Sequence, residues 1–83
     1  MNLIQKQAGK MKEKIRNILS KVFEMQIDDD FSKDSTDKWD SLAHLYIIVE
    51  LENTFGISFT PQEMGAIKSY QEIVDIVTKK YLK

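Results

Sequence analysis

The residue with the clearest potential for chemistry is Ser41, which follows Asp40 and precedes Leu42 at the point where a helix is expected to begin. The first backbone N–H groups of a helix have no intrahelical acceptor, and the positive end of the helix dipole favours negative charge there. A phosphate ester on the Ser41 hydroxyl is therefore electrostatically favoured. The alternative is that Asp40 and Ser41 only cap the helix.

His44 lies three residues after Ser41, close enough on a helix to suggest a serine nucleophile with a histidine base. The rest of a serine hydrolase is missing from the sequence. No glycine-rich elbow surrounds the serine, no oxyanion donors can be identified, and 83 residues leave little room for a second lobe. We therefore expect a protein that is not an enzyme, in which His44 is a surface or half-buried helix residue or contacts a partner.

Metal chemistry has little support in the composition. The absence of cysteine excludes disulfides, thiolate zinc sites and iron–sulfur clusters, and a single histidine removes most other transition-metal sites. The run of aspartates at 28–30 lacks the alternating ligand spacing, the central glycine and the closing glutamate of a calcium loop. We predict no metal site.

Length and composition indicate one small globular domain spanning residues 1–83, in a chain that is 42% hydrophobic and 30% charged. No uninterrupted apolar segment is long enough to span a membrane, so a cytoplasmic location is expected. Segment 1–21 carries six basic residues and one acid, whereas segment 22–63 carries ten acids and two bases. The basic segment contains no aromatic residue, which argues against nucleic-acid binding.

The elements that must position Ser41 are predicted to be all-α: a small four-helix bundle with three main helices, one short helix and a long loop between helices one and two. The first helix is predicted over 11–23, with residues 1–10 as a possible N-terminal extension because Gly9 disfavours a helix interior. Polar turn-forming residues predict a loop over 24–40, anchored by Phe31 and closed by Trp39.

Capping signals define the remaining helices. The second helix is predicted to begin at Asp40 or Ser41 and to end at Phe55, followed by a left-handed Gly56. A capping box at 60–63 with proline at the first helical position predicts the short helix. Another capping box at 69–72 predicts the last helix, with its apolar face formed by Ile73, Ile76, Val77 and Tyr81.

Two groups of apolar residues lie along the second helix, and a domain of this size is expected to bury one of them, although coverage of both by helices one and four is an alternative. We predict one core formed by Ile15, Ile18, Leu19, Phe31, Ile47, Ile48, Leu51, Phe55, Ile57, Ile73, Ile76 and Val77. The other group is expected to form an exposed docking surface beside Ser41, made of Leu42, Leu45, Tyr46 and Val49.

The motif Asp40-Ser41-Leu42, at the start of a helix that ends in Phe55-Gly56-Ile57 and follows a long loop, resembles the acyl carrier protein family. The likeness in order and spacing covers most of the chain. It implies that Ser41 is esterified by 4′-phosphopantetheine, whose thiol carries acyl or aminoacyl groups as thioesters. In a chain without cysteine, such a thiol has to come from a prosthetic group.

The resemblance also implies partners: a phosphopantetheinyl transferase and the enzymes that load and accept the acyl group. Ala43 and Tyr46 depart from the acidic second helix that is typical of fatty-acid carriers, which favours a specialised lipid, polyketide or glycolipid pathway. A monomer is expected, because no heptad seam is present. The alternative function is a helical protein–protein interaction domain without a cofactor.

Overall fold

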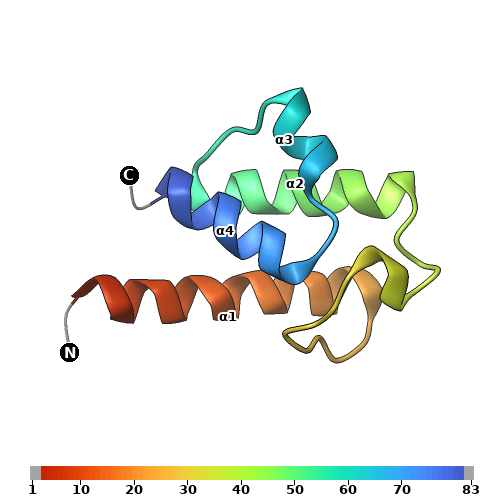
Figure 1. Ribbon diagram of the computed structural model, residues 1–83, viewed down its shortest axis with the longest axis horizontal. Helices are drawn as coiled ribbons and strands as arrows, with labels where there is room; N and C mark the ends of the chain where they lie inside the picture. Colours follow the sequence, from red (N-terminus) through yellow and green to blue (C-terminus); the bar gives the residue numbers. More distant parts are fainter. Residues whose placement is uncertain (1–2, 82–83) are drawn as a thin grey trace.

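The computed structural model describes residues 3–81 and contains four α-helices (Figure 1). They are α1 (Leu3–Phe23), α2 (Ser41–Phe55), α3 (Pro61–Ala66) and α4 (Tyr70–Tyr81), with a short 3₁₀ turn at Lys33–Ser35. Helices α1 and α2 run in opposite directions along the domain, and α1 packs against both α2 and α4 (Figure 1). The predicted all-α architecture is confirmed. Within residues 3–81, none of the helices is both long and apolar enough to cross a membrane.

Helix α2 has the ends that its sequence predicts. The Asp40 carboxylate accepts a hydrogen bond from the backbone N–H of Ala43 at 2.9 Å, which satisfies one of the free donors of the first turn. Gly56 has φ 64° and ψ 38°, and its N–H donates to the carbonyl of Glu52. Because this left-handed conformation is easiest for glycine, Gly56 stops the helix directly after Phe55.

The short helix α3 begins with the predicted capping box. The Thr60 hydroxyl accepts from the N–H of Glu63, and the Glu63 carboxylate accepts from the N–H of Thr60. At the start of α4 the Ser69 hydroxyl likewise accepts from the N–H of Glu72. This cap is not identical, because the Glu72 carboxylate accepts from the hydroxyl of Ser69 and from the N–H of Lys68. Both helices therefore start where local side-chain hydrogen bonds replace the missing helical ones.

The long loop is tied to the start of α4. An isolated antiparallel bridge joins Ser32 to Ser69, and the N–H of Tyr70 donates to the carbonyl of Phe31 at 2.9 Å. Phe31 is buried, as predicted, and stacks on Trp39 with ring centroids 6.0 Å apart. Phe23 packs on both rings, so three aromatic side chains hold the loop against the end of α1.

Helix α1 extends through Gly9 to Leu3, beyond the segment that the sequence predicts most strongly. Arg16 fixes this helix to the rest of the domain: it donates to the carbonyl of Ile27, to the carboxylate of Asp29 and to the Tyr70 hydroxyl. Its guanidinium also lies 4.6 Å from the centre of the Tyr70 ring. The hydrogen bond from Arg16 to Asp29 is the main reason why the pKa of this guanidinium is raised above its ordinary value.

Two residues of the predicted core, and one of the predicted apolar face of α4, are less buried than the others. Ile57 and Ile76 are only half-buried at the edge of the core, and Tyr81 is 47% exposed, although its ring meets Phe55 edge-on at 5.6 Å. The buried residues of α4 are Tyr70, Ile73, Val74 and Val77, so the observed face shares Ile73 and Val77 with the predicted one. The structure adds these residues to the predicted core: Met11, Phe23, Ile27, Trp39, Phe59, Ile67, Tyr70 and Val74.

Candidate functional site

Ser41 is the first residue of α2 and is exposed. The side chain of Asp40 and its carbonyl engage the N–H groups of Ala43 and His44, so the helix entrance is held by the residue directly before the serine. Among the described residues, no group forms a hydrogen bond with the Ser41 hydroxyl. The Ser41 side chain is therefore accessible and lies at the positive end of the α2 dipole.

A shallow depression of about 260 Å³ surrounds the serine. It lies between the start of α2, the 3₁₀ turn and the segment that joins α3 to α4. The residues that line it are Lys33, Asp40, Ser41, His44, Gly65, Ile67 and Lys68. The N–H of Lys33 donates to the carbonyl of Lys68 at 2.8 Å, which brings two lysines from distant parts of the chain to the same edge. The lining therefore carries the positive charges of Lys33 and Lys68 and the negative charge of Asp40.

His44 holds neighbouring segments together, and neither of its ring nitrogens is available to act as a base for Ser41. The indole Nε1 of Trp39 donates to His44 Nδ1 at 3.0 Å, and His44 Nε2 lies 2.7 Å from the carbonyl oxygen of Met64. Both ring nitrogens are thus engaged away from the serine. A general base needs a free nitrogen directed at the nucleophile, so the arrangement does not support the serine-hydrolase hypothesis.

No cluster of histidine, cysteine, aspartate or glutamate within residues 3–81 is suited to hold a metal ion. Asp29 of the acidic run pairs with Arg16, and Asp28 accepts from the N–H of Asp30. These aspartates therefore organise the loop.

One side of α2 is left uncovered near Ser41. Leu42, Leu45 and Tyr46 are each more than half exposed, at 60%, 57% and 57%, and Val49 is 43% exposed. The second apolar group of the same helix, Ile47, Ile48, Leu51 and Phe55, is buried against the core. The structure thus leaves the group nearest the serine open to other molecules.

The comparisons with known proteins identify the family. A solved structure of holo acyl carrier protein from Geobacter metallireducens matches with a TM-score of 0.72 and 30% sequence identity, over 83% of each chain. This chain belongs to the acyl carrier protein family. No family model and no curated protein matches it in the sequence comparisons. The resemblance inferred from Asp40-Ser41-Leu42 and the helix order is confirmed.

Within this acyl carrier protein fold, part of the depression at Ser41 could not be foreseen from the sequence. Lys33, Gly65, Ile67 and Lys68 come from segments that are expected to be a loop, a short helix and a linker. The capping boxes around them give only local structure. Their placement beside Ser41 follows from the bridge between Ser32 and Ser69, which is a long-range contact.

Proposed function

We propose that this protein is a stand-alone acyl carrier in which Ser41 holds 4′-phosphopantetheine as a phosphodiester. The observation that carries the proposal is the position of an exposed, unbonded serine hydroxyl at the first residue of α2, in a chain of the acyl carrier protein family. When bound, the group supplies the thiol that holds acyl or aminoacyl cargo as a thioester.

The residues around Ser41 fit such a group. Asp40 keeps the helix entrance formed, and Leu42 presents an exposed apolar side chain next to the attachment point. Lys33 and Lys68 add positive charge, which favours the phosphodiester, and the depression offers room for the beginning of a flexible arm. The chain itself performs no catalysis in this role, consistent with the engagement of His44 elsewhere.

The proposed partners are a phosphopantetheinyl transferase and the enzymes that load and accept the cargo, which approach over Leu42, Leu45, Tyr46 and Val49. The surface there is apolar. We infer that the protein serves a specialised lipid, polyketide or glycolipid pathway, since Ala43 and Tyr46 replace the acidic character of fatty-acid carriers.

The test is incubation of the chain with a broad-specificity phosphopantetheinyl transferase and coenzyme A, followed by intact-mass measurement. Wild type should gain one phosphopantetheinyl group, and Ser41→Ala should gain none. Ser58→Ala is the matched control, because Ser58 is also exposed, and it should be modified like wild type. If wild type gains no mass, the proposal fails and the cofactor-free interaction domain takes its place.

A further inference from the structure

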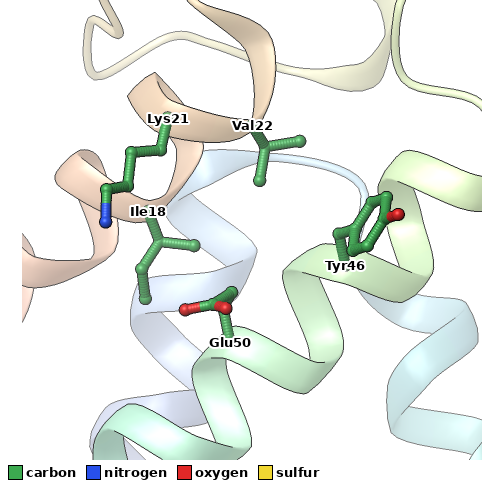
Figure 2. Close-up of a pocket in the computed structure, with 5 residues that line it drawn as sticks. All are labelled: Ile18, Lys21, Val22, Tyr46 and Glu50. Carbon is green, nitrogen blue, oxygen red and sulfur yellow. The ribbon is translucent and has the colours of Figure 1, made fainter.

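A second groove lies between α1 and α2 and is lined by none of the residues around Ser41 (Figure 2). It has a volume of about 320 Å³ and is bordered by Ile18, Lys21 and Val22 of α1 and by Tyr46 and Glu50 of α2. Figure 2 shows the α1 side chains across the groove from those of α2. The groove continues into a neighbouring hollow lined by Lys14, Asn17, Ser20 and Thr54.

The groove is continuous with the exposed apolar group of α2. Tyr46 belongs to both. It borders the groove, and it is exposed on the same side of α2 as Leu45 and Val49. Ile18 is buried and Val22 half-buried, so they provide an apolar floor. An apolar strip therefore leads from the start of α2 into the groove, which is the shape that accepts a helix with one apolar face.

The charge along the α1 side of the groove is positive. Lys14 and Lys21 lie two helical turns apart on the same side of α1, and Lys10 precedes them by one further turn. The ion pairs found among the described residues are Arg16 with Asp29 and Lys80 with Glu63. Neither Lys14 nor Lys21 is in one of these ion pairs, and Glu50 is the single acidic residue of the lining.

We propose that this groove binds an acidic amphipathic helix of a partner protein. Apolar side chains of that helix would cover Ile18, Val22 and Tyr46, and its carboxylates would face Lys14 and Lys21. The charge complementarity selects this partner over the other occupants of an apolar groove. A second copy of this chain is disfavoured, because a two-fold interface through the groove brings the two rows of lysines together. An anionic membrane is disfavoured by the concave shape of the groove, which a flat lipid surface does not fill.

The experiment uses the unmodified chain and two synthetic helical peptides of about 18 residues with the same leucine face. One peptide carries glutamates beside that face and the other carries lysines. The acidic peptide should bind, shift the amide resonances of Ile18, Lys21, Val22 and Tyr46, and bind more weakly as salt is raised. Lys14→Glu with Lys21→Glu should weaken its calorimetric Kd about tenfold or more.

Lys12→Glu with Lys79→Glu is the matched control, because these lysines line the separate surface between α1 and α4, and its Kd should stay within about twofold of wild type. The proposal is overturned if both peptides bind equally well, if the shifts lie outside the groove, if phosphatidylglycerol vesicles bind in preference to the acidic peptide, or if the chain dimerises through this face. None of these results depends on Ser41, so the carrier proposal and this one fail separately.

Discussion

The indole Nε1 atom of Trp39 and the Nδ1 atom of His44 lie 3.0 Å apart, and this contact selects the tautomer of the neutral imidazole ring. An indole nitrogen can only donate, so Nδ1 must accept. The proton of the neutral ring is then on Nε2, which donates to the carbonyl of Met64. One imidazole therefore links the loop, the first turn of α2 and the end of α3 around Ser41.

Replacement of His44 by phenylalanine should destabilise the domain. The variant leaves the Trp39 N–H without its acceptor and removes one of the two donors to the Met64 carbonyl, which keeps the N–H of Ile67. Such a part-buried loss costs about 1–3 kcal/mol. Chemical denaturation should show a lower midpoint, whereas the exposed control Tyr46→Phe should stay within about 0.5 kcal/mol of wild type. Modification of Ser41 should persist in folded His44→Phe. An abolished modification of the folded variant would contradict the positioning role.

Truncation of the buried side of α2 should remove much of the stability. Leu51 is fully buried and Phe55 is 6% exposed, so Leu51→Ala and Phe55→Ala should each cost about 2–5 kcal/mol, a large part of what a small domain possesses. Ile76→Ala, at the half-buried edge, should cost less. Thermal unfolding of the three variants gives the order, and equal midpoints would contradict this packing.

Acidic substitutions on the exposed side of α2 should impair partner docking without unfolding the domain. Leu45→Glu and Val49→Glu change side chains that are 57% and 43% exposed, so the free energy of unfolding should change by less than about 1 kcal/mol. The rate of Ser41 modification should fall, because in the proposed function the transferase approaches over this surface. Gln71→Glu on α4 is the exposed control. A loss of several kcal/mol, or an unchanged rate, would show that the surface has another role.

Acid should weaken the attachment of α3 through Glu63. Its hydrogen bond with Lys80, and next the one from the Thr60 N–H, hold the pKa of the Glu63 carboxyl below its ordinary value. A lowered folded-state pKa stabilises the fold above the unfolded-state pKa, and this contribution disappears as the pH falls through the folded-state value. Glu63→Gln should therefore lower the urea midpoint near pH 7 and have a smaller effect near pH 3.

Glu13→Gln is the control for that measurement, since Glu13 is an exposed residue of α1, and its urea midpoint should follow wild type at both values of pH. A constant difference between Glu63→Gln and wild type across the pH range would show that the carboxyl charge is not the cause.

Local hydrogen bonds explain what the sequence by itself determined. The start of α2 at Asp40, its end at Gly56 and the start of α3 at Thr60 each depend on contacts within a few residues, so the residue types are sufficient to predict them. The same holds for Ser41 as the candidate site, because a helix entrance and its neighbours are local features of the chain.

Contacts between distant segments decided the rest. In the sequence Tyr70 is part of a capping box, which does not predict burial. It is buried because Arg16 and the loop around Phe31 pack against it. Lys33 and Lys68 meet at Ser41 only through a pairing of two loops. Periodicity found both apolar groups of α2, but only the packing of α1 and α4 determined which of them is covered, because burial depends on the neighbours that a helix acquires in the folded chain.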